Sequence, residues 1–257
     1  MNINKHLILL FSVLFFLFAV SVSSGCFRKN ESDVKSVVRN ELDQLKNLDS
    51  ETTQKYIPYT ELFPDATENT DLTDEINKTF SLFFRKFNYK ISDVIVGTAN
   101  HSATVSVKLT TIDSKVLARD FKAELLRTQI TESAQAQKGN IKDSSRSLEA
   151  HYLILNHLLN TNDYDTAETD CNIQLVNTGN DKKEKWKIQR TNSLEDDLVG
   201  GLIADLADPD ILSPEDTLTV YLDTLQKLDL KEMTSYLGVV NIMNTSCLLY
   251  TSPSPRD

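Results

Sequence analysis

The chain has 257 residues, of which 40% are apolar and 25% are charged, as is typical of folded globular proteins. Its formal net charge of −10 argues against a nucleic-acid partner, because phosphate binding requires clusters of Lys and Arg. The composition excludes collagen, a coiled coil and a polytopic membrane protein. The 3 cysteines are too few for a disulfide scaffold.

The N-terminus has the layout of a secretory signal peptide. Lys5 precedes an apolar run from Leu7 to Val22, and small residues then lead to Cys26. A membrane-spanning helix needs about 20 apolar residues, so a permanent spanning anchor is the weaker interpretation of this shorter run. Ordinary secretion with cleavage after Ser23 is the other alternative.

The end of this segment, Ser24-Gly25-Cys26, resembles the lipobox of bacterial lipoproteins. In that family the cysteine thiol receives a diacylglycerol, and the chain is cut just before the cysteine. The resemblance implies a signal peptide over residues 1–25, cleavage between Gly25 and Cys26, lipidation of Cys26, and a tether over residues 26–32. Cys26 would then hold the protein on the extracytoplasmic face of the cell membrane, and two acyl chains suffice for stable anchoring.

Three helices are predicted next. Asp33 to Leu48 places apolar residues on one helical face, and Asp49 or Ser50 caps a short helix that ends at Ile57. The third helix, Asp74 to Phe87, is rich in aromatic residues, and Thr73 or Asp71 is its expected cap.

A hairpin, two more helices and a second hairpin follow. The period changes to two in Tyr89 to Val96 and in Ser102 to Ile112, with a turn at Gly97 to His101. Lys115 to Ile130 and Ser145 to Leu159 are predicted helices, either separated by a polar loop around Gly139 or joined into one long helix. The second hairpin pairs a strand containing Ala167, Thr169, Cys171, Ile173 and Leu175 with one containing Trp186 and Ile188.

Antiparallel hairpins grouped apart from the helices indicate an α+β fold, not a doubly wound sheet. We expect one domain over residues 33–202. A linker over residues 203–214 follows, and Ser213-Pro214-Glu215 has the form of a helix start with proline near its first position.

The segment after the linker repeats the beginning of the domain. Glu41 to Ile57 aligns without gaps on Tyr221 to Leu237, and both segments share a Leu-Asp corner followed by a Tyr. A truncated second copy over residues 215–246 is therefore expected. Two unrelated amphipathic helices that merely look alike are the alternative.

The last eleven residues, Cys247 to Asp257, match one reading frame of a common transposase sequencing adapter. We expect this segment to be an artefact, with the natural protein continuing differently after about residue 245. A natural Ser- and Pro-rich tail is the alternative.

This organisation resembles a family of small Gram-positive lipoproteins whose domains of unknown function are similar to the nuclear transport factor 2-like cone. The resemblance rests on the lipobox, on the pattern from Val38 to Asp49, and on the Trp186 strand followed by Leu198-Val-Gly-Gly-Leu. It implies helices packed on antiparallel hairpins. The wider fold family includes isomerases and dehydratases, but a fold does not define a function.

Candidate chemistry is sparse. Among the histidines, His101 is expected to be solvated in a turn, and His151 and His157 are six positions apart on a helix, so they cannot bind one metal locally. Cys171 is expected to be a buried structural thiol, Trp186 a core residue, and the acidic runs Glu195-Asp196-Asp197 and Asp208 to Asp210 a solvated helix start and a linker. No catalytic, cofactor or metal motif is present in the sequence, so neither a catalytic residue nor a cofactor is assigned.

Two functions remain open at this point. The first is a membrane-tethered, non-catalytic binding or envelope-associated lipoprotein whose ligand the sequence does not identify. The second is an isomerase- or dehydratase-like enzyme that uses the cone interior, with Tyr152 or His151 as its polar group. Converging titratable groups in an apolar pocket favour the enzyme, whereas a solid apolar core favours the binding protein.

Overall fold

The computed structural model describes residues 30–57, 62–64, 66, 72–97, 101–136, 145–179 and 185–228. These residues form two compact units, and the chain passes between them several times. Unit 1 contains residues up to 57, 84–111 and 166–200, and unit 2 contains 58–83, 112–165 and the residues from 201 onward. The signal peptide, Cys26 and the adapter-like segment lie outside the described residues.

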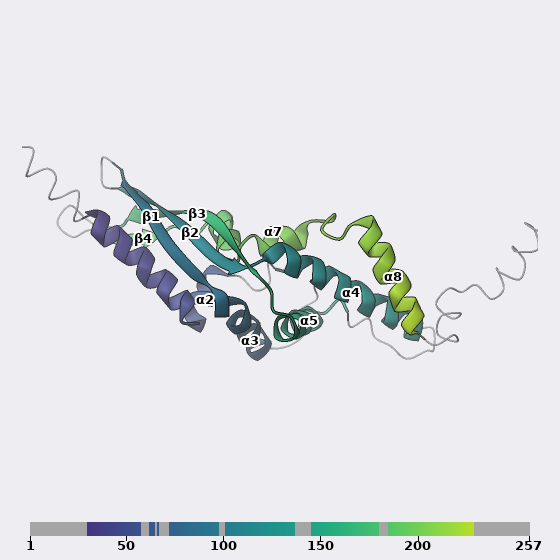
Figure 1. Cartoon of the computed structure of the whole chain (residues 1–257). Helices are drawn as coiled ribbons and strands as arrows, with labels where there is room; N and C mark the ends of the chain where they lie inside the picture. Colours follow the sequence, from purple (N-terminus) through teal and green to yellow (C-terminus); the bar gives the residue numbers. More distant parts are fainter. Residues whose placement is uncertain are drawn as a thin grey trace, which may run out of the picture. The chain divides into compact units, whose positions relative to one another are not determined.

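Unit 1 is built on an antiparallel sheet with the strand order β1-β2-β3-β4 (Figure 1). The strands are β1 (Asn88–Val96), β2 (Ser102–Ile112), β3 (Thr166–Asn177) and β4 (Trp186–Ile188). Its helices are an N-terminal helix over residues 30–46, α2 (Ser50–Tyr56) and α6 (Asn192–Leu198), with the 3-10 turn η1 at Phe84–Lys86. Both predicted hairpins and the α+β class are confirmed.

The central strands β2 and β3 run antiparallel. The backbone N–H of Asn177 donates to the carbonyl of His101 at 2.9 Å, and Ser106 Oγ donates to Asn172 Oδ1 at 2.8 Å. The ion pair of Lys108 with Asp170, at 3.5 Å, continues the same register, because residue numbers rise on β2 as they fall on β3.

The two faces of the sheet differ sharply in polarity. Alternate residues of β2 and β3 are buried on one face, whereas the other face carries polar side chains such as Lys108 and Glu168. Burying each large aliphatic side chain contributes about 1.5–3 kcal/mol, so this face provides much of the stability of unit 1. The buried residues are Ala103, Val105, Val107, Leu109, Cys171, Ile173 and Leu175.

A β-bulge in β1 changes which of its side chains point toward the apolar face of the sheet. Ile91 pairs with Val107, but the next pair is Asp93 with Ser106, so Ser92 is an extra residue. As a result Val94 and Val96 share a face with Tyr89, while Ile95 points away and is 61% exposed.

The N-terminal helix runs beside β1. Tyr89 Oη donates to Asp43 Oδ1 at 2.6 Å, and Lys46 Nζ donates to Asn88 Oδ1 at 2.9 Å. The helix buries one apolar stripe, as the sequence predicts. That stripe consists of Val34, Val38, Leu42 and Leu45.

The predicted second helix is confirmed as α2. Asp49 is its N-cap, and its carboxylate accepts the backbone N–H of Thr52 at 2.9 Å. The same carboxylate accepts the Thr52 hydroxyl, and both hydrogen bonds lower the pKa of Asp49.

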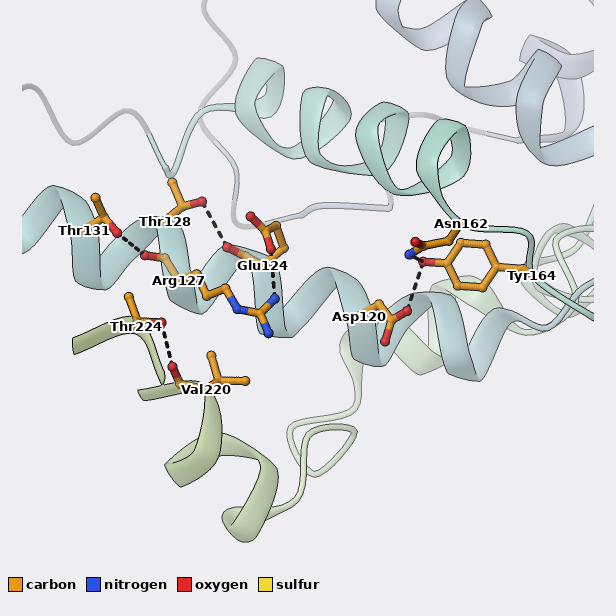
Figure 2. A network of polar contacts seen from close by, with 9 residues as sticks. All are labelled: Asp120, Glu124, Arg127, Thr128, Thr131, Asn162, Tyr164, Val220 and Thr224. Atoms are coloured by element: carbon orange, nitrogen blue, oxygen red, sulfur yellow. Dashed lines mark hydrogen bonds and ion pairs between the residues drawn. The ribbon is translucent and has the colours of Figure 1, made fainter. Parts of the chain in front are cut away.

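Unit 2 is helical throughout its described residues. Its helices are α3 (Thr73–Phe83), α4 (Ser114–Ala136), α5 (Leu148–Thr161), α7 (Leu202–Ala207) and α8 (Pro214–Lys227). Helices α5, α7 and α8 all contact α4, and α3 packs on α5. Figure 2 shows α4 between α5 and α8, with an ion pair of Arg127 and Glu124 at 2.9 Å on its surface.

Tyr164 ties the end of α5 to α4. Its hydroxyl donates to Asp120 Oδ2 at 3.1 Å and accepts from Asn162 Nδ2 at 3.0 Å (Figure 2). Burial, and then the Asp120 carboxylate, raise the pKa of Tyr164 to about 12, so the phenol stays protonated and keeps this hydrogen bond.

Several predicted helix ends are wrong by a few residues. Helix α4 extends to Ala136 because Ala134 is buried, although the sequence becomes polar after Ile130. Helix α5 begins at Leu148, where Ser147 accepts the N–H of Ala150 at 3.1 Å. Because α5 has its own cap and packs on α4, the single long helix is excluded.

Helix α8 confirms the predicted start at Ser213-Pro214, and Ser213 accepts the N–H of Asp216 at 3.0 Å. Its expected apolar face, Leu218, Leu222, Leu225 and Leu228, is only partly buried. Leu225 is 5% exposed, whereas Leu218 and Leu222 are 57% and 49% exposed. Val220 and Thr224 complete the buried side in place of the two exposed leucines.

Gly200 and Gly201 turn the chain from α6 to α7 with φ angles of 66° and 91°. Both are in the left-handed region, which costs other residues about 1–2 kcal/mol. A Cβ on Gly200 would also lie 2.2 Å from Thr111 Oγ1, whereas a Cβ on Gly201 would meet nothing closer than 3.8 Å.

We predict that Gly200→Ala lowers the free energy of unfolding by about 2–4 kcal/mol, since backbone strain and overpacking add. Gly201→Ala is the matched control and should cost about 1–2 kcal/mol, from strain alone. Urea unfolding of the two variants measures the difference. Equal losses would contradict the contact with Thr111.

Candidate functional site

A cavity of about 560 Å³ lies within unit 2, between α4, α7, the start of α5 and the segment around Phe63. Its volume falls within the range of small-molecule sites, about 300–1,000 Å³. Apolar side chains form most of its wall, and a few polar groups interrupt them. The lining residues are Leu62, Phe63, Pro64, Ala66, Phe121, Lys122, Leu125, Gln129, Ser145, Arg146, His151, Ile203, Leu206 and Ala207.

An aromatic cluster forms one wall of the cavity. The rings of Phe63 and Phe121 stack with centroids 5.1 Å apart, and the His151 imidazole lies 4.8 Å from the Phe63 ring and 5.6 Å from the Phe121 ring. Tyr152 packs edge-on against Phe63 at 5.6 Å. Such contacts fix ring positions and contribute about 0.5–1.5 kcal/mol each beyond burial.

The polar lining of this cavity is basic. Lys122 from α4, Arg146 from the segment before α5, and His151 from α5 all reach the wall. Among the described lining residues none is an Asp or Glu, although the whole chain has 37 acidic against 27 basic residues. Basic side chains therefore outnumber acidic ones in the described lining, although the Glu132 carboxylate lies close behind it and accepts the backbone N–H of the lining residue Ser145 at 3.1 Å.

His151 is held largely in its neutral form. Burial, and then the positive charge of Lys122, lower the pKa of this imidazole below its usual value. Its Nδ1 is buried and has no hydrogen-bond partner among the described residues. Because this atom has no accessible surface, it is shielded from the cavity, and leaving it without a partner costs about 1–3 kcal/mol.

The other candidate residues do not join this site. His101 is exposed as predicted, and His157 is exposed on α5, away from the lining. Trp186 is buried in unit 1, as expected for a core residue. Tyr152 is fully buried and does not line the cavity.

Cys171 is a buried free thiol, as predicted. Burial, and then the neighbouring Asp197, raise its pKa, and this disfavours the reactive thiolate. The Cys171 side chain is hydrogen-bonded to Asp197, whose own pKa burial raises.

The prediction of a solvated acidic run at Glu195-Asp196-Asp197 is wrong, because Glu195 is buried and both Asp196 and Asp197 are half-buried. Glu195 is buried and pairs with Arg190, and Asp197 is half-buried against Cys171. Both carboxylates belong to α6, which packs on β3, so they serve the packing of unit 1. Asp208 and Asp210 are exposed, as expected.

Within the described residues, no group of three or more His, Cys, Asp and Glu side chains could hold a metal ion. In the same part of the chain, no helix is long and apolar enough to cross a membrane. Gly25 and Cys26 lie outside the described residues, so their role stays a prediction.

The sequence singled out His151 but not its neighbours. Lys122 and Arg146 lie 24 positions apart in segments with no recognisable motif. Phe63 lies outside every helix and strand that the sequence predicts. Long-range helix packing assembles these residues, and no local pattern carries that information.

We predict that His151 makes stability depend on pH. The pKa of His151 is lower in the folded state than in the unfolded chain. As the pH falls below about 6.5, the unfolded chain therefore binds a proton before the folded protein does, and the free energy of unfolding decreases. His151→Gln should remove this part of the slope between pH 8 and pH 5, whereas His157→Gln on the same helix should keep it. Urea unfolding at several pH values tests this, and identical slopes in both variants would contradict it.

Comparison of the chain with models of known protein families, with curated proteins and with solved structures finds no match in any of the three.

Proposed function

We propose that the protein is a lipid-anchored extracytoplasmic binding protein without catalytic activity, whose ligand enters the cavity of unit 2. The observation that carries the proposal is the cavity itself, an apolar space of about 560 Å³ with a few polar groups at its wall. This combination is the usual form of a small-molecule site.

Binding is favoured over catalysis by the chemistry of the wall. General acid–base catalysis needs a proton donor and acceptor that converge on one reacting atom. Burial, and then Lys122, lower the pKa of His151, which leaves an imidazole that can accept a proton, but the described lining offers no carboxylate and no second imidazole to work with it. An isomerase- or dehydratase-like enzyme would be favoured instead by a carboxylate or a second imidazole beside His151.

The membrane attachment is proposed from the sequence. The lipobox-like Ser24-Gly25-Cys26 places cleavage before Cys26 and the acyl chains on its thiol. The partner at that end of the molecule is therefore the membrane itself.

We also propose that residues 33–202 have the nuclear transport factor 2-like fold of small Gram-positive lipoproteins. In support, the N-terminal helix and α2 accompany an antiparallel sheet with one apolar face, and a bulge bends β1. The binding cavity of our proposal lies in the helical unit, not on this sheet.

A truncated second copy is part of the same proposal. In the alignment of the two similar segments, Lys227 corresponds to Asn47, and α8 ends within a residue of where the N-terminal helix ends. Leu45 and its counterpart Leu225 are both buried, whereas Leu42 is buried and its counterpart Leu222 is exposed. An exposed leucine at that position fits a helix that lacks its sheet.

We predict that Cys26→Ala abolishes both metabolic labelling with a radioactive fatty acid and the cut before residue 26. The mature mass of the wild type should include the diacylglycerol, and the variant should keep its signal peptide. Cys171→Ala is the control and should be labelled normally. Undiminished labelling or membrane recovery in Cys26→Ala would contradict lipidation there.

We predict that the full chain binds N-phenyl-1-naphthylamine, a neutral apolar fluorophore, at one saturable site. Leu125→Trp should remove this binding, because the larger side chain fills the cavity that Leu125 lines. Leu126→Trp is the matched control: Leu126 is equally half-buried on α4 but does not line the cavity. Fluorescence titration measures the binding, and thermal melting confirms that both variants are folded. If both variants bound the probe like the wild type, the proposal would be contradicted.

A further inference from the structure

We infer that the cavity of unit 2 selects small amphipathic anions, meaning an apolar body that carries one acidic group held by Lys122, Arg146 and His151. This inference rests on the proposed binding function and adds the chemical class of the ligand. It follows from the distribution of charge and apolar surface around the wall.

The apolar body has a defined place. It would lie among the apolar lining residues, which are Phe63, Phe121, Leu125, Ile203 and Leu206. Removing apolar ligand surface from water there gains about 25 cal/mol per Å². Flat or branched apolar groups would also contact the two stacked phenyl rings.

The acidic group is selected by charge. The described residues of the wall offer two permanent cations and no carboxylate, so a cationic ligand would be repelled and a neutral one would gain nothing from them. Charge-assisted hydrogen bonds are about twice as strong as neutral ones, and the apolar surroundings strengthen them further. An acidic ligand therefore has an advantage that apolar shape alone does not give.

His151 supplies the third contact. Its imidazole lines the cavity and lies against the Phe63 and Phe121 rings. Lys122 and Arg146 are the charged residues that line the cavity with it, from α4 and from the segment before α5. An anion between these groups would offset the repulsion that Lys122 exerts on a protonated His151.

A matched pair of probes tests the charge requirement. The probe 8-anilinonaphthalene-1-sulfonate is N-phenyl-1-naphthylamine with one sulfonate added, and it stays ionised at every working pH. Each probe is titrated with the full-length wild type and with the Leu125→Trp variant. Only the binding that is lost in the variant is counted as binding in the cavity. The sulfonate probe should bind about tenfold more tightly than the neutral probe, as one charge-assisted contact predicts.

Variants then assign the contact to residues. Lys122→Met and Arg146→Met should each weaken the sulfonate probe about tenfold and leave the neutral probe unchanged. Lys115→Met, an exposed lysine on the same helix outside the lining, controls for net charge and should change neither. His151→Gln should weaken the sulfonate probe, and His157→Gln should not.

The outcomes separate the two proposals. If neither probe shows binding that Leu125→Trp removes, the binding function itself fails. If the neutral probe binds but the sulfonate adds no affinity, or Lys122→Met and Lys115→Met behave alike, the cavity binds apolar molecules and the selectivity for anions is overturned. Specific, charge-dependent binding that is lost in Lys122→Met and Arg146→Met supports the inference.

Discussion

The architecture of unit 2 depends on one constraint: α4 has to bury more than one side of itself. Helices α5, α7 and α8 all pack on it, so its apolar residues cannot form a single stripe. Leu117 and Phe121 are fully buried near its start, and Ile130 and Ala134 are buried near its end. A helix in this position organises its neighbours, and its stability comes from their packing more than from its own propensity.

The same constraint produces the cavity. Where α5, α7 and the Phe63 segment meet α4, their side chains do not fill the space completely, although most protein interiors are closely packed. Phe121 belongs to the aromatic cluster, and Lys122 is the next residue on α4. The packing of Phe121 therefore also fixes the position of the positively charged Lys122 at the wall of the cavity. Core packing and the polarity of the cavity wall are therefore linked through two adjacent residues.

The fold was more predictable than the site. Periodicity identified both hairpins, because strands with one buried face alternate strictly, and capping residues such as Asp49 and Ser213 predicted helix starts. The polar end of α4 misled the prediction, since Ala134 is buried by packing that no local pattern records. The short helix α7 was also missed, because most of it lies where a linker was predicted. At the site, His151 could be named from the sequence, but the basic character of the cavity depends on residues that only the packing of the helices brings together.

The two outer strands of the sheet have a consequence for contacts between copies of the protein. An exposed strand edge is a template for pairing with another chain, which leads to aggregation. Here β4 has only three residues, and β1 is interrupted by its bulge and carries Lys90. The short β4 and the bulge in β1 both disfavour pairing with a strand of another chain. Copies of the protein can therefore lie close together without joining their sheets into a fibre.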